Sequence, residues 1–137
     1  MSGETDLNKL IASMHPELRD GTYVFVTMPL DGADPVGLEA VMSFREDEGV
    51  TMIVPEQAAS AAGLVGVFPC RMVTLMVHSA LNAVGFLATI TTHLAAAGIS
   101  VNAVSAFFHD HLFVPAGKAE ETVEILCRMA ADAKPEG

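Results

Sequence analysis

Residues 71–115 of this chain read RMVTLMVHSALNAVGFLATITTHLAAAGISVNAVSAFFHDHLFVP, and their pattern decides the fold. The stretch begins with an apolar run, RMVTLMV, that is typical of a strand. The loop HSALNAVG then leads into FLATITTHLAAAG, where Leu87, Ile90 and Leu94 recur at helical spacing. Two more strand-like runs follow, ISVNAVSAFF and LFVP, with the tight turn HDH between them. The pattern predicts a strand, a helix and then two further strands.

The remaining segments add strands to the first half of the chain and a helix to the second. The first half lacks a long amphipathic helix, so it cannot easily bury its sheet alone. The second half has no strand after its last helix. We therefore expect two interlocked halves, 1–69 and 70–137, with Tyr23–Met28 or Leu64–Phe68 paired into the sheet that carries Met72–Val77. The other expected elements are helices over 6–14, 56–62 and 118–133 and a hairpin over 41–54.

The junction Ser79–Phe86 is the candidate ligand site. The first amides of a helix have no partner within the helix, and they carry the positive end of its dipole. A carboxylate or phosphate is therefore favoured there. Asn82 is expected to cap the helix or to offer its amide to a ligand, and Gly85 marks a close approach of the backbone. The alternative is purely structural: Ser79 and Asn82 only cap the helix, and Gly85 only relieves crowding.

The same junction resembles a known family. The run Asn82-Ala83-Val84-Gly85-Phe86-Leu87 is similar to the ligand loop of ACT domains, which are regulatory modules that bind amino acids. Asn82 stands where that family usually has Asp, and Val84 stands where it often has Pro. Residues 95–102, AAAGISVN, resemble the family's helix end and second strand. Residues 21–26, 44–51 and 109–115 resemble small standalone bacterial proteins that are made of two ACT-like halves.

This resemblance implies an α+β, ferredoxin-like fold in which two ACT-like βαββαβ halves with antiparallel sheets interlock. It also implies a non-enzymatic regulatory module that binds a small molecule, with an amino acid as the expected ligand. No catalytic residue, metal ligand or cofactor is expected. The residues expected to bind the ligand are Ser79, Leu81, Asn82, Ala83, Val84, Gly85, Phe86 and Asn102.

Composition limits the partners. Hydrophobic residues make up 51% and charged residues 18% of the 137 residues, which predicts extensive burial or an apolar surface covered in a homodimer. The formal net charge of −10 argues against nucleic acid and anionic membranes as partners. Cys70 and Cys127 lack the spacing of a metal site and are read as reduced thiols. No secretory leader opens the chain, so a cytoplasmic protein is expected.

The turn His109-Asp110-His111 supports a different class of function. Residues two apart on a strand share a face, so His109 and His111 would point one way and Asp110 the other. With His78 as a third ligand, this turn would serve a small metal-dependent or acid–base enzyme. The simpler interpretation is polar turn chemistry and hydrogen bonding. An interaction module without any ligand is the third hypothesis. The sequence contains no phosphate-binding loop with lysine and no nucleophile elbow.

Overall fold

The computed structural model describes residues 3–134, which form two compact units. The terminal unit combines the residues up to Arg19 with those from Met72 onward. The central unit contains Asp20–Arg71. The strand β5 (Val67–Leu75) begins in the central unit and ends in the terminal unit. One strand therefore supplies residues to the sheets of both units.

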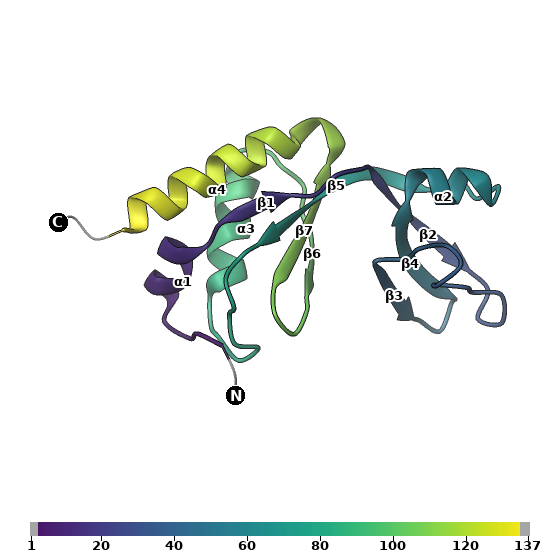
Figure 1. Cartoon of the computed structure of the whole chain (residues 1–137), viewed down its shortest axis with the longest axis horizontal. Helices are drawn as coiled ribbons and strands as arrows, with labels where there is room; N and C mark the ends of the chain where they lie inside the picture. The colour runs from purple at the N-terminus through teal and green to yellow at the C-terminus, as the bar shows by residue number, and fades with distance from the viewer. Residues whose placement is uncertain (1–2, 135–137) are drawn as a thin grey trace. The chain divides into compact units, whose positions relative to one another are not determined.

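The terminal unit contains three α-helices and both strands that follow the loop 79–86. Its elements besides β5 are α1 Leu7–Ser13, β1 Pro16–Leu18, α3 Phe86–Ala96, β6 Asn102–Ser105, β7 Asp110–Pro115, the short helix η1 Ala116–Lys118 and α4 Ala119–Ala133. Its sheet has the order β1-β5-β7-β6. β1 runs antiparallel to β5 and β6 runs antiparallel to β7. Helix α4 contacts β1 and α1, as Figure 1 shows.

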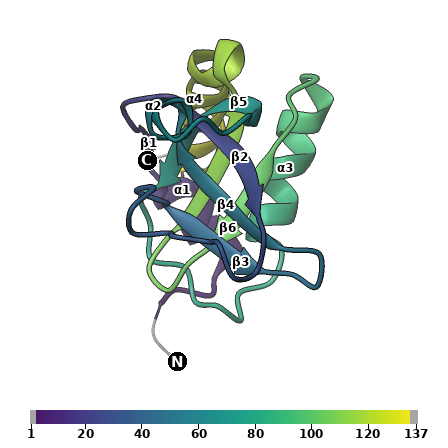
Figure 2. The ribbon, with the colours of Figure 1, turned by 90° about the vertical axis from the view of Figure 1, so that its right-hand side faces the viewer.

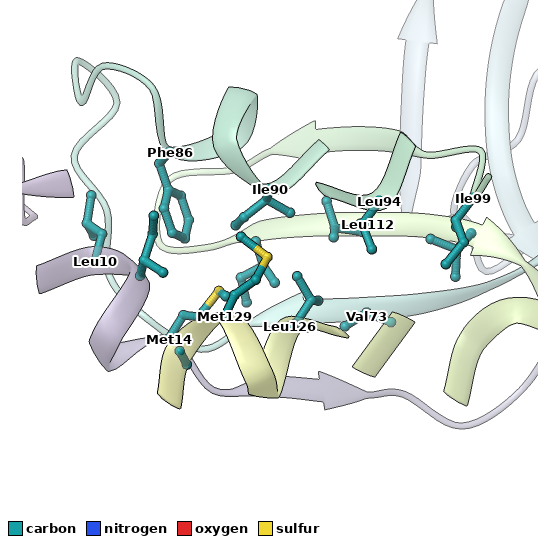
Figure 3. Close-up of a cluster of buried hydrophobic side chains, with 14 of the residues drawn as sticks. Leu10, Met14, Val73, Phe86, Ile90, Leu94, Ile99, Leu112, Leu126 and Met129 are labelled. Atoms are coloured by element: carbon teal, nitrogen blue, oxygen red, sulfur yellow. The ribbon is translucent and has the colours of Figure 1, made fainter. Parts of the chain in front are cut away.

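The core of the terminal unit lies between one face of this sheet and the three helices. The strands contribute Val73 and Leu75 from β5 and Leu112 and Val114 from β7, all fully buried. Figure 3 shows Val73 and Leu112 facing apolar side chains from the helices. The helical side contributes Leu10 from α1 and Met14 directly after it, Phe86, Ile90 and Leu94 from α3, and Leu126 and Met129 from α4. Burying one large apolar side chain contributes roughly 1.5–3 kcal/mol, so α1 is an integral part of this core.

The strand that the second half lacks after its last helix is supplied by residues near the start of the chain. β1 pairs with the end of β5, with Pro16 opposite Leu75 and Leu18 opposite Val73. We did not predict a strand at Pro16–Leu18. Its proline stands at the first position of a short strand, which is one of the few places where a sheet tolerates proline. The terminal unit thereby acquires a fourth strand from outside the predicted second half.

The central unit is built from the first half of the chain. Its elements besides the start of β5 are β2 Tyr23–Met28, β3 Met42–Arg45, β4 Val50–Pro55 and α2 Glu56–Ala61. The strand order is β3-β4-β2-β5, and Figure 2 shows the first three side by side. β2 meets β5 at Tyr23–Cys70 and Phe25–Val67. A loop with turns over residues 29–41 stands where a βαββαβ unit has its first helix.

Most of the expected elements are present, and the α+β class with antiparallel pairing is confirmed. The expected pairing of Tyr23–Met28 with the strand that contains Met72 is confirmed as β2 beside β5. Residues 64–68 are not a strand of their own, because β5 begins at Val67. The turn before β7 is Ala106–His109 rather than HDH, because Asp110 and His111 already pair with β6.

The compact units group residues differently from the predicted halves 1–69 and 70–137, because the residues before Asp20 join the later part of the chain. The division of the sequence into halves between residues 69 and 70 therefore stays a prediction. Among residues 3–134, no helix has both the length and the apolar character that crossing a bilayer requires.

Leu10→Ala tests whether α1 belongs to the core. Leu10 is fully buried in α1, so its truncation should lower the free energy of unfolding by about 2–5 kcal/mol. Asn8→Ala is the matched control, because Asn8 is exposed on the same helix and should change stability by less than about 0.5 kcal/mol. Urea unfolding followed by circular dichroism measures both. Equal midpoints for the two variants would contradict the packing of α1.

Candidate functional site

The loop between β5 and α3 is held in place by the start of the chain. The Glu4 amide donates to the His78 carbonyl oxygen at 2.8 Å, and the Ala80 amide donates to the Glu4 carbonyl oxygen at 2.8 Å. These bonds form a short parallel bridge between Glu4 and Ser79. We did not predict this contact, because the two segments are far apart in the chain.

Gly3 makes this contact possible. Its φ is +101°, and a Cβ at this position would lie 2.6 Å from the Ala80 backbone nitrogen. Only glycine adopts this backbone conformation without strain and also allows so close an approach. The segment that includes Gly3 and Glu4 is therefore part of the scaffold of the loop.

Helix α3 begins without a side-chain cap. Its N-cap is Gly85, which has a left-handed backbone with φ of 90°, and no side chain of the described residues caps the helix. The prediction that Ser79 or Asn82 caps it is therefore wrong. The helical ladder begins with the Thr89 amide, which donates to the Gly85 carbonyl oxygen at 2.9 Å. The amides of the three preceding residues, 86–88, have no partner within the helix.

A cavity of about 250 Å³ lies at this helix start. Five of the eight predicted ligand residues line it, namely Ser79, Leu81, Ala83, Gly85 and Phe86. Asn82, Val84 and Asn102 are not among the lining residues, and all three are exposed. The lining residues that we did not predict are Ala80, Leu87, Ala88, Ser105 and Asp110.

Asp110 is the only acidic group among the described residues that line this cavity. It is the first residue of β7 and is only 6% exposed. The Ser79 hydroxyl donates to Asp110 Oδ2 at 3.2 Å, so the loop and β7 are joined at the cavity. The strand alternation around Asp110 was the one sequence signal that separated it from His109 and His111.

The two histidines beside Asp110 make separate contacts. His111 Nδ1 lies 3.0 Å from the Thr74 hydroxyl oxygen, and His109 Nδ1 lies 3.3 Å from the Val77 carbonyl oxygen. Burial lowers the pKa of His111 below its usual value, and the nearby His109 and Arg19 lower this pKa further, whereas Asp110 raises it. The ring centroids of His109 and His111 lie 6.5 Å apart.

A metal site at this turn finds no support in the part of the chain that the structure describes. No group of three His, Cys, Asp or Glu side chains there is arranged to hold a metal ion. His78, the expected third ligand, packs instead against Phe108 and Phe107, with ring centroids 5.4 and 6.3 Å away. Both phenylalanines are 61% exposed at the tip of the hairpin between β6 and β7.

Both cysteines are free thiols, as predicted. Cys70 is buried in β5, and its Sγ donates to the Tyr23 carbonyl oxygen at 3.4 Å. Burial raises the pKa of the Cys70 thiol from 9.0 to about 11. Cys127 is exposed on α4. A buried thiol with a raised pKa is a poor nucleophile.

Family comparisons cover both halves of the sequence. Residues 2–71 match one family model described as an ACT domain, and residues 67–128 match a second model with the same description. The first match alone spans more than half of the 137 residues. None of the curated proteins compared with this chain matches it.

Several solved structures are similar to the whole chain. A Vibrio cholerae protein of unknown function, described as a possible transport protein, is 40% identical with a TM-score of 0.83, covering 94% of this chain and 99% of that chain. A protein from Agrobacterium tumefaciens is 19% identical with a TM-score of 0.72, covering 85% and 89%. The regulatory subunit of aspartate kinase from Thermus flavus is 12% identical with a TM-score of 0.60, covering 84% and 96%. These matches confirm the predicted ferredoxin-like fold with ACT-like halves.

Gly3→Ala tests the anchoring of the loop. The added Cβ would meet the Ala80 backbone, so the bridge to Glu4 should open and hydrogen exchange at the Ala80 amide should accelerate. We expect a stability loss of about 1–3 kcal/mol. Gly21→Ala is the control, because Gly21 has a similar φ of +89° with nothing within 4 Å of the new Cβ. The anchoring is contradicted if both variants leave exchange at Ala80 unchanged.

The two thiols should differ in reactivity. At about pH 8, Cys127 should react with an aromatic disulfide reagent in the native protein, whereas Cys70 should react only after unfolding. As the pH rises towards the raised pKa of about 11, the Cys70 thiolate forms and its native-state reaction should accelerate. Absorbance of the released thiolate counts the reacting groups, and Cys127→Ser assigns them. Rapid native labelling of Cys70 at about pH 8 would show that it is not buried.

Proposed function

We propose that this chain, which belongs to the ACT domain family, is a regulatory module without catalytic activity that binds an amino acid at the cavity over the start of α3. The observation that carries the proposal is the coincidence of two features in one cavity of about 250 Å³. One feature is the uncapped helix start, whose amides favour a carboxylate. The other is the pair of polar side chains, Ser79 and Asp110.

The ligand carboxylate has defined donors in this proposal. The amides of Phe86, Leu87 and Ala88 precede the first helical hydrogen bond, and all three residues line the cavity. We had expected the amides around Ala83, Val84 and Gly85 to do this. The Ala83 amide already donates to the Ala80 carbonyl oxygen at 2.9 Å, so the proposed donors move into the first turn of α3.

The charge of the chain favours a zwitterion over a polyanion. A net charge of −10 repels anions at long range, although charges beyond roughly 8–10 Å are screened at physiological salt. An amino acid with an uncharged side chain has no net charge at pH 7, and its ammonium group is favoured in acidic surroundings. At 12% identity, the regulatory subunit of aspartate kinase from Thermus flavus shares the fold of this chain.

We further propose that the protein acts as a cytoplasmic homodimer whose only other partner is the ligand. The terminal unit exposes several large apolar side chains, and an apolar surface of this kind is often covered by a second copy. The free thiols are compatible with a reducing compartment. The exposed apolar residues are Leu81, Val84, Phe107 and Phe108.

Gly85→Val tests the loop assignment. Gly85 has a φ of +90° and lines the cavity, so a β-branched side chain would strain the backbone and occupy the ligand space. Calorimetric titration against the twenty amino acids should give binding to the wild type and none to Gly85→Val. The variant should stay folded, because the new Cβ meets only Leu7 Cδ2, at 3.6 Å.

Gly98→Val is the matched control for backbone strain. Gly98 follows the other end of α3, has a φ of +76° and has nothing within 4 Å of an added Cβ. It should lose about 1–2 kcal/mol of stability and keep its affinity for the ligand. If wild type and Gly85→Val bind an amino acid equally well, the loop assignment is wrong. If the wild type binds none of the twenty, the regulatory proposal is overturned.

A further inference from the structure

Among the described residues, no cationic side chain pairs with the acidic group in the cavity over α3. Asp110 is 6% exposed, and the hydrogen bond it accepts comes from a neutral donor, the Ser79 hydroxyl, at 3.2 Å. None of the described residues that line the cavity is Lys or Arg. A buried carboxylate is costly unless it is paired with a positive charge or well hydrogen-bonded.

The two histidines beside Asp110 make contacts elsewhere. His111 is the next residue along β7, and strand alternation directs it away from Asp110, towards Thr74. Burial lowers the pKa of His111, which disfavours its charged form. His109 contacts the Val77 carbonyl oxygen. None of the described residues that line the cavity therefore carries a cationic side chain to offset the charge of Asp110.

We propose that Asp110 binds the ammonium group of a small amino acid, while the first amides of α3 bind its carboxylate. This inference rests on the proposed function, since it assigns the second half of the same ligand. Asn82 of the loop is exposed and does not line the cavity. In this chain the acidic residue comes from β7 instead of from the loop.

The size and lining of the cavity define the class of amino acid. A volume of about 250 Å³ lies below the roughly 300–1,000 Å³ that is usual for drug-sized ligands. The small residues Ala80, Ala83 and Ala88 lie beside the helix start, and Ser105 adds a hydroxyl group. The small lining residues and the Ser105 hydroxyl therefore favour an amino acid with a small apolar or hydroxyl-bearing side chain.

The first test uses wild-type protein and needs no variant. Calorimetry compares alanine and serine with their analogues that lack the amino group, propionate and 3-hydroxypropionate. We expect each amino acid to bind about tenfold to 100-fold more tightly than its analogue, because a hydrogen bond to a charged group contributes about 1.5–3 kcal/mol. Phenylalanine, whose side chain is larger, should bind more weakly than alanine and serine. Equal affinity for an amino acid and its analogue would overturn the assignment of Asp110.

The second test removes the charge at the cavity. Asp110→Asn keeps the size of the side chain and an oxygen that accepts from Ser79, so it should stay folded. It should lose about tenfold to 100-fold in affinity for the amino acid and none for the analogue. Asp47→Asn is the matched control, because it makes the same change in net charge at an exposed residue of the central unit. This variant should bind as the wild type does.

The outcomes separate the two proposals. If the wild type binds an amino acid and Asp110→Asn binds it equally well, the role of Asp110 is refuted and the proposed function stands. If the wild type binds no amino acid, the proposed function fails first. If Asp110→Asn does not fold, Ser79→Ala replaces it in the test. Without the Ser79 hydroxyl, the Asp110 carboxylate depends more on the ammonium group of the ligand. The preference for the amino acid over its analogue should therefore persist in this variant. Loss of that preference would contradict the assignment.

Discussion

The apolar face of β5 and β7 is the constraint on which the rest of the terminal unit depends. Four fully buried side chains from these two strands need a cover, and α3 and α4 alone leave the edge beside β5 unpaired. The chain solves this with its first described residues. β1 pairs with the end of β5, and Leu10 of α1 and Met14 directly after this helix pack into the same core. The hydrophobic requirement of one sheet thus ties the start of the chain to its last helix.

The same tie shapes the candidate site. The segment before α1 bonds to His78 and Ala80, and Leu7 of α1 lies next to Gly85. Three stretches that are distant in sequence therefore surround one helix start: the N-terminal segment, the loop 76–85 and the beginning of β7. A cavity assembled in this way keeps its shape only while the core beneath it is intact. This explains why a loop with few buried side chains of its own can hold a defined geometry.

The sequence predicted the parts of this structure that repeat with a regular period. α3 and α4 were expected within two residues of their bounds, because their apolar residues follow the helical spacing, and β2 was expected residue for residue. β1 was missed because three residues that begin with proline carry no alternation. Asn82 was expected at the cap, but the turn from Ala80 to Ala83 leaves it exposed and Gly85 takes that position. Asp110 was read as turn chemistry, since only the tertiary contact with Ser79 reveals its place in the cavity.

The packing of β1 and α1 into the terminal unit has a consequence for the order in which the protein folds during synthesis. The central unit can form once residues 20–71 have been made, because its share of β5 ends at Arg71. Leu10 and Met14 are made much earlier than their partners on α4. They stay exposed to water, and to chaperones, until α4 has been made. The middle of this chain can therefore fold first, whereas the unit that holds the cavity must wait for α4.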